Sequence, residues 1–168
     1  MIMPDHARLM ARYNRWQNES LYTAAASLDQ TARLEDRGAF FRSIHETLAH
    51  ILWADRIWLS RFDMCEKPTC AGHETLKLWA DWEVLKADRM KMDDVIDKWA
   101  DGFSESDLRD SLEWYSGAAG RILSKPVWLL VTHIFNHQTH HRGQVHAMLT
   151  ATGASPDDTD LFLMEGEA

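Results

Sequence analysis

The stretch THIFNHQTHHRGQ, residues 132–144, places four of the chain's nine histidines within nine residues. Imidazole is the commonest protein ligand for metal ions near neutral pH, so this density points to a metal site. Each residue of an α-helix advances about 100° around the axis, which puts His137 and His141 on one face, one turn apart. His133 lies one turn earlier on nearly the same stripe. One helix cannot easily close a site of three nitrogens alone, so a further ligand is expected from another helix.

Helical patterns account for most of the chain around this stretch. Apolar residues recur at helical spacing over residues 4–28, 40–62, 76–100 and 126–151. In the second pattern, Ser43 and Glu46 have the spacing of a capping box, which would begin the helix at Ser43. The preceding residues 39–41 could instead form its first turn, and the sequence leaves both readings open.

The ends of the last two helical patterns carry their own signals. Gly102 is expected to end the third helix. Ser124 is expected to cap the fourth helix, with Pro126 in its first turn and Gly153 at its end.

Residues 108–123 break the helical pattern. Two short apolar runs flank the Gly-rich segment SGAAG at residues 116–120, which predicts a small β-hairpin. Four amphipathic helices of this length predict an all-α four-helix bundle, with the hairpin placed before the last helix. We expect a single domain over residues 1–168.

The bulk composition excludes several classes of function. The chain has 168 residues and a net charge of −8, and no cluster of Lys and Arg stands out, so nucleic-acid binding is not expected. No apolar run approaches the roughly 18–20 residues of a membrane span. The N-terminal residues lack the regions of a signal peptide, so a cytoplasmic protein is expected.

The second helical pattern offers two histidines as the missing ligand. His45 and His50 differ by about 140° around a helix, so both cannot face one point. His50 shares a stripe with Ala54 and Ile57 that is expected to face the core, whereas His45 is expected to face solvent. The predicted metal site is therefore His50 with two histidines from residues 132–144.

That site has the full ligand set His50, His137 and His141. Three neutral nitrogens with an open position suit Zn²⁺ or Ni²⁺, and imidazole also accepts Fe²⁺, Mn²⁺ and Co²⁺. Glu46, His133 and Gln144 are the candidates for catalytic support around the metal. Each also has an ordinary structural reading: Glu46 as a capping residue, His133 as a core residue, and Gln144 as a contact between helices.

Three blocks of sequence together resemble a known family. They are YNRWQN at residues 13–18, TLAHILWADRIWL at residues 47–59, and HIFNHQTHHRGQ at residues 133–144. In this order the chain resembles the DinB family, within the DinB/YfiT-like superfamily. The resemblance covers nearly the whole chain, and the block at residues 133–144 is its specific part.

The resemblance implies a four-helix bundle with a crossed topology and a homodimer. It implies a divalent metal held by three histidines, which match His50, His137 and His141. Some relatives in the superfamily are transferases and isomerases that use small thiols. The leading functional hypothesis is therefore a metalloenzyme that joins a small-molecule thiol to an electrophile. The alternatives are a metal-dependent hydrolase and a non-catalytic stress-response bundle with a structural metal.

Overall fold

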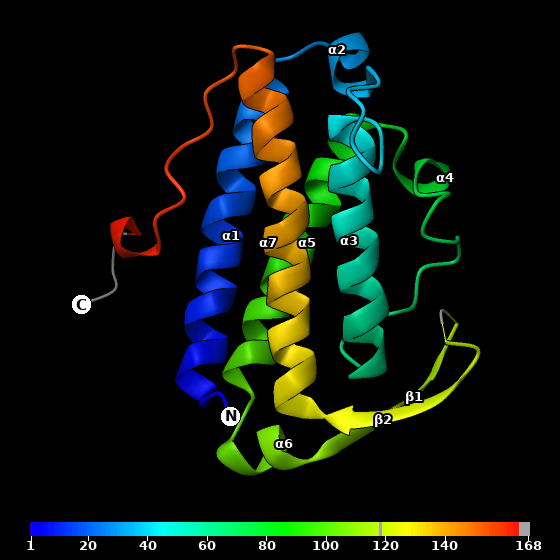
Figure 1. The fold of residues 1–168 in the computed structure, drawn as a ribbon, viewed down its shortest axis with the longest axis vertical. Coiled ribbons are helices and arrows are strands. Elements are labelled where there is room, and N and C mark those ends of the chain that lie inside the picture. Colours follow the sequence, from blue (N-terminus) through cyan, green and yellow to red (C-terminus); the bar gives the residue numbers. More distant parts are fainter. Residues whose placement is uncertain (118, 165–168) are drawn as a thin grey trace.

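The computed structural model describes residues 1–117 and 119–164, and four long helices lie along its longest axis (Figure 1). These are α1 (Pro4–Ala26), α3 (Ile44–Arg61), α5 (Trp82–Asp101) and α7 (Val127–Ala151). The shorter elements are α2 (Gln30–Leu34), α4 (Leu76–Trp79), α6 (Glu105–Arg109), strands β1 (Ser111–Ser116) and β2 (Arg121–Pro126), and the 3₁₀ turn η1 (Leu161–Leu163). None of the helices in this part of the chain is both long and apolar enough to cross a membrane.

The helices follow a crossed order that places α3 beside α7. In Figure 1, α1 and α7 run upward, whereas α3 and α5 run downward. α1 packs on α5 and α7, and α3 packs on the same two helices. The parallel pair α3 and α5 needs a long return connection, residues 62–81, which contains α4 and passes outside α3. The predicted four-helix bundle with crossed topology is confirmed.

The beginning of α3 resolves the choice that the sequence left open. The side chain of Ser43 accepts a hydrogen bond from the backbone N–H of Glu46 at 3.1 Å, and its hydroxyl donates to the Glu46 carboxylate at 2.9 Å. Ser43 is therefore the N-cap, and residues 39–41 lie outside the helix. This cap sets the rotation of α3 from its first turn.

The third long helix begins later than the sequence predicted. Residues 76–79 form the separate short helix α4, and α5 begins at Trp82. The reason is Asp81, whose carboxylate accepts hydrogen bonds from the backbone N–H groups of Glu83 and Val84 and caps a new helix. Gly102 is the C-cap of α5, as predicted.

The expectation that Ser124 caps the last helix was wrong. Ser124 pairs with Glu113 inside the predicted hairpin, whose second strand runs to Pro126. α7 then begins directly at Val127, whose backbone N–H donates to the carbonyl of Asp110 at 2.8 Å. The hairpin itself is confirmed, although residue 118 of its Gly-rich turn lies outside the described residues. At the other end of α7, Gly153 has a φ of 86°, which ends the helix.

His45 is buried rather than exposed, contrary to the sequence expectation. Its side chain is fully covered, and Nε2 donates to the carbonyl oxygen of Trp79 at 2.6 Å. The connection that contains α4 covers this side of α3, a contact that helical periodicity does not reveal.

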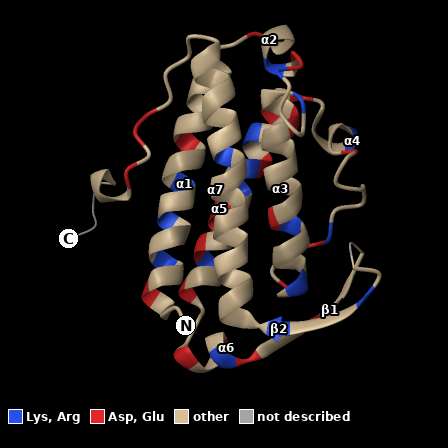
Figure 2. Cartoon of the chain, viewed as in Figure 1, with Lys and Arg blue, Asp and Glu red and all other residues tan. Residues whose placement is uncertain are grey.

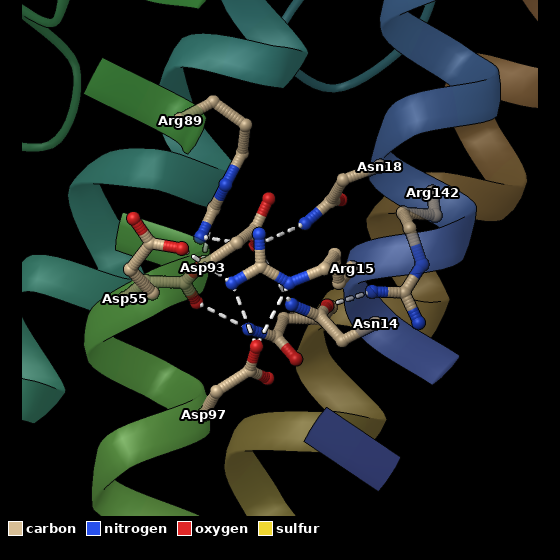
Figure 3. Close-up of polar contacts among 10 residues, drawn as sticks. Asn14, Arg15, Asn18, Asp55, Arg89, Asp93, Asp97 and Arg142 are labelled. Atoms are coloured by element: carbon tan, nitrogen blue, oxygen red, sulfur yellow. Dashed lines mark hydrogen bonds and ion pairs between the residues drawn. The ribbon is translucent and has the colours of Figure 1, made fainter. Parts of the chain in front are cut away.

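A buried polar network joins the four long helices (Figure 3). Arg89 of α5 forms ion pairs with Asp55 of α3 and with Asp93 of its own helix. Gln138 of α7 donates to Asp55 at 2.8 Å, and Asn18 of α1 donates to Asp93 at 2.9 Å. All five residues are at most 3% exposed. Because each partner needs the others to offset its desolvation, we expect the network to fix how α3 and α7 are rotated toward each other.

Candidate metal centre

His50 lies on the face of α3 that is turned toward α7. The side chain is 9% exposed, and the ring of Phe41 stacks on it with centroids 3.7 Å apart. Among the described residues, the buried Nδ1 of His50 has no hydrogen-bond partner. A buried polar atom without a partner ordinarily lowers the stability of the folded state by about 1–3 kcal/mol. An unpaired nitrogen at this position fits a residue whose imidazole serves a ligand.

His137 and His141 come from successive turns of α7, as their spacing predicted. Their ring centroids are 4.5 Å apart. The ring of His50 lies 5.4 Å from the first and 4.9 Å from the second. Because α3 and α7 run in opposite directions and pack directly on each other, the three rings converge between them.

The three histidines form a group that could hold a metal ion. One nitrogen from each ring lies within 4.8 Å of the other two, so a small adjustment of the rings brings all three onto one ion. Three imidazoles suit borderline divalent ions, of which Zn²⁺ is the most familiar, and they leave a coordination position for another ligand. The set His50, His137 and His141 is the one that the sequence predicted.

The surroundings keep these imidazoles neutral. Burial, together with repulsion from the other two rings, lowers the pKa of His50 to about 3. Burial and repulsion from neighbouring histidines lower the pKa of His137 to about 4. Burial also lowers the pKa of His141, although its hydrogen bond to Gln144 acts in the opposite direction. At neutral pH the nitrogen lone pairs are therefore available to a cation rather than occupied by protons.

Charge on the bundle is distributed unevenly around this group. Charged residues of both signs lie along α1, α3 and α5 and at the ends of the bundle, whereas α7 is almost entirely uncharged (Figure 2). Its one residue of the Lys, Arg, Asp and Glu classes is Arg142. The candidate ligands of α7 therefore lie on a helix with a single formally charged residue.

The three candidates for catalytic support occupy different places. The side chain of Gln144 contacts His141, with Oε1 2.9 Å from Nδ1. His133 lies beside the group, with its ring centroid 5.9 Å from that of His137. Glu46 is held in the N-terminal cap of α3 by Ser43 and is not a member of the three-histidine group. A catalytic role for these three residues stays a prediction.

A cleft of about 550 Å³ opens from the histidine group toward the hairpin. His50 and His137 line one end of it, and Trp58 and Trp114 lie along its wall with ring centroids 5.5 Å apart. Arg61 also lines the cleft. The histidine group is thus connected to a space large enough for a small molecule.

Sequence reasoning did not find this cleft. Trp53 and Trp58 are partly buried residues that pack against the core and also line the cleft. Trp53 donates from Nε1 to the carbonyl oxygen of Cys70 at 2.9 Å, which brings the loop after α3 over the site. The available signal was the density of tryptophan, with eight in 168 residues.

Comparison with known proteins finds a matching family and a similar fold. The model of the DinB family matches residues 3–167. Protein DinB of Bacillus subtilis (strain 168) is 25% identical over 169 residues, which cover 96% of this chain and 95% of that protein. The crystal structure of a DinB-like protein from Bacillus cereus ATCC 10987 matches with a TM-score of 0.61 and 16% identity, covering 86% of this chain and 91% of that one. This last likeness concerns the fold alone.

Proposed function

The chain belongs to the DinB family, and from that premise we propose that it is a metal-dependent thiol S-transferase acting on small electrophiles. The observation that carries the proposal is the cleft, because two of the three histidines that could hold a metal also line it. A purely structural metal is usually enclosed by four protein ligands. A group of three histidines beside a cleft instead favours a metal that exchanges a ligand with the cleft.

A divalent ion at this position would lower the pKa of a thiol and hold the resulting thiolate. In the proposed reaction, the thiolate sulfur attacks an electrophilic carbon, a C–S bond forms, and the leaving group departs with the electron pair of the broken bond. The aromatic wall of Trp58 and Trp114 would cover the apolar part of the electrophile and exclude water.

The side chains around the histidines have separate parts in this proposal. Gln144 holds the Nδ1–H of His141, which leaves Nε2 of that ring as its ligand atom. His133 lies in the cleft, and burial lowers its pKa, so a neutral ring nitrogen is available to accept the proton of the incoming thiol.

A conjugation assay tests the function directly. Zinc-loaded and nickel-loaded protein would be incubated with 1-chloro-2,4-dinitrobenzene and a panel of small thiols, and the thioether product followed by its absorbance. We expect metal-dependent acceleration over the uncatalysed reaction, and its loss in His137→Ala. His146→Ala is the matched control, because His146 is on the same helix but lines a different pocket.

The other functional hypotheses predict different results in this assay. Metal-dependent loss of the electrophile without any thiol would identify a hydrolase and overturn the transferase. Full metal occupancy with no reaction across the panel would favour a structural metal. The homodimer expected from the family stays a proposal, which light scattering on the eluted peak of a sizing column would check.

A further inference from the structure

The cleft has a positively charged end opposite the histidine group. Arg61, in the last turn of α3, points its guanidinium at two tryptophan rings. The guanidinium carbon lies 4.1 Å from the ring centroid of Trp58 and 5.4 Å from that of Trp114. These contacts hold the planar group against the wall of the cleft. Stacking on ring faces still leaves the N–H groups along the edge of the guanidinium able to donate.

In the described part of the chain, no acidic side chain neutralises this end. Across residues 1–117 and 119–164, Arg61 forms no ion pair, and the residues that line the cleft include no Asp or Glu. Lys67 lines the same cleft and adds a second positive charge. The charged residues that line the cleft are thus positive, whereas the whole chain has a net charge of −8. Burial lowers the pKa of Arg61.

A series of ring contacts connects the two ends of the cleft. The ring of His133 lies 5.9 Å from that of His137 and 5.1 Å from that of Trp58, which in turn contacts Arg61. Eleven residues separate His50 from Arg61, which corresponds to about 16 Å along α3. Eleven residues make about three helical turns, so His50 and Arg61 lie on the same face of α3.

We propose that Arg61 binds a carboxylate on the molecule whose reacting atom lies at the histidine group, with an apolar or aromatic body along the tryptophan wall between them. The inference rests on the proposed function and names its substrate class. The carboxylate can belong to the thiol or to the electrophile, because both would enter the same cleft. Its recognition is a charge-assisted hydrogen bond to a guanidinium that has no ion-pair partner among the residues that the structure describes.

The first experiment isolates the anion site from the metal. Metal-free protein would be titrated with 2-naphthoate and with the neutral 2-naphthalenemethanol, using tryptophan fluorescence and calorimetry. We expect the carboxylate to bind about tenfold more tightly than the alcohol. Arg61→Met should bring the two dissociation constants within about twofold, while leaving binding of the alcohol unchanged.

The matched control is Arg56→Met. Arg56 lies on the same helix and also contacts a tryptophan, with its guanidinium carbon 5.9 Å from the ring centroid of Trp79, but it does not line the cleft. The preference for the carboxylate should survive this change. Equal affinity of the wild type for both compounds, absence of binding by either, or a preference that persists in Arg61→Met would each overturn the inference.

The second experiment asks which reactant carries the carboxylate. Zinc-loaded protein would be titrated with 6-mercaptohexanoate and 6-mercapto-1-hexanol. A preference for the former that disappears in Arg61→Met places the carboxylate on the thiol. Equal binding of the two thiols, with the naphthoate preference intact, places it on the electrophile. If neither thiol binds, the proposed thiol transfer is wrong. The carboxylate site is then judged by the first experiment alone.

Discussion

The Oε1 atom of Gln144 lies 2.9 Å from Nδ1 of His141. An amide oxygen only accepts, so His141 donates from Nδ1 and its Nε2 carries the lone pair. The amide nitrogen of Gln144 is 3.3 Å from Nε2 of His140, which holds the amide from the other side. A residue outside the histidine group thus determines which nitrogen of His141 is offered to a metal.

Loss of this contact should weaken metal binding without abolishing it. We expect Gln144→Ala to lower zinc affinity about 10–100-fold, the usual effect of removing a residue that orients a metal-binding histidine. Gln144→Glu, which keeps an acceptor at the same position, should restore most of the affinity. Competition with a chromogenic chelator measures both variants. Unchanged affinity in the alanine variant would show that the hydrogen bond has no part in the site.

Removal of a candidate metal ligand should weaken metal binding more than removal of Gln144, which orients that ligand. In His141→Ala, we expect metal content after tag-free purification to fall well below one ion per chain, because only two imidazoles would remain in the group. The metal-dependent gain in melting temperature should disappear with it, since an ion stabilises only the folded state that binds it. Elemental analysis and thermal unfolding with and without chelator provide the two measurements. His146→Ala should behave like the wild type, and full occupancy in His141→Ala would remove that residue from the site.

Local sequence patterns predicted those parts of the structure that depend on one helix at a time. The i, i+4 spacing of His137 and His141 predicted their convergence, and the capping box at Ser43 contained the correct start of α3. The core-facing stripe of α3 identified His50 as the third member. Each of these inferences needs only the helical repeat and short-range capping chemistry.

The failures come from contacts that helical periodicity alone does not report. The apolar pattern continues from Leu76 through residues 82–100, and no Gly or Pro interrupts it, so the break at Asp81 had no strong signal. Ser124 has a hydroxyl that could cap a helix, but the residue pairs with Glu113 in the hairpin and therefore belongs to a strand. The cleft requires the hairpin to meet the end of α3, a contact made by Trp58 and Trp114 from segments far apart in sequence.

His45 shows the same limitation and leads to a prediction about pH. Burial lowers the pKa of His45 in the folded protein below its ordinary value of 6.5. The unfolded chain therefore takes up a proton more readily as the pH falls through this value, and the folded state loses stability relative to it. The stabilising contribution is present above pH 6.5 and is lost as the pH falls toward the folded-state pKa.

His45→Gln should reduce this pH dependence. Glutamine can keep a donor near the carbonyl of Trp79 but does not titrate. We therefore expect unfolding free energies of the metal-free variant to fall less steeply between pH 7 and pH 5 than those of the metal-free wild type. Urea titrations at several pH values supply the comparison. The contributions of the other histidines to the pH dependence cancel in the difference, because both proteins contain them. Parallel curves would show that His45 titrates alike in the folded and unfolded states.

Asp55 tests whether the buried network sustains the arrangement of helices behind the histidines. It is 1% exposed, pairs with Arg89, and accepts from Gln138, the residue after His137. Asp55→Ala leaves Arg89 with one carboxylate partner in a buried environment, so we expect a loss of about 3–5 kcal/mol in the unfolding free energy of the metal-free protein. Asp55→Asn keeps the shape and should permit folding if the alanine variant does not fold, with a smaller loss.

The matched control for Asp55 is an ion pair at the surface of the same bundle. Asp94 contacts Arg15 at 2.7 Å, but its side chain is 63% exposed, so Asp94→Ala should cost no more than about 1 kcal/mol. Urea unfolding of both variants gives the difference directly. Equal losses at the two positions would mean that solvent or local rearrangement compensates for the missing carboxylate, and the network could not then be what sets the rotation of α3 against α7.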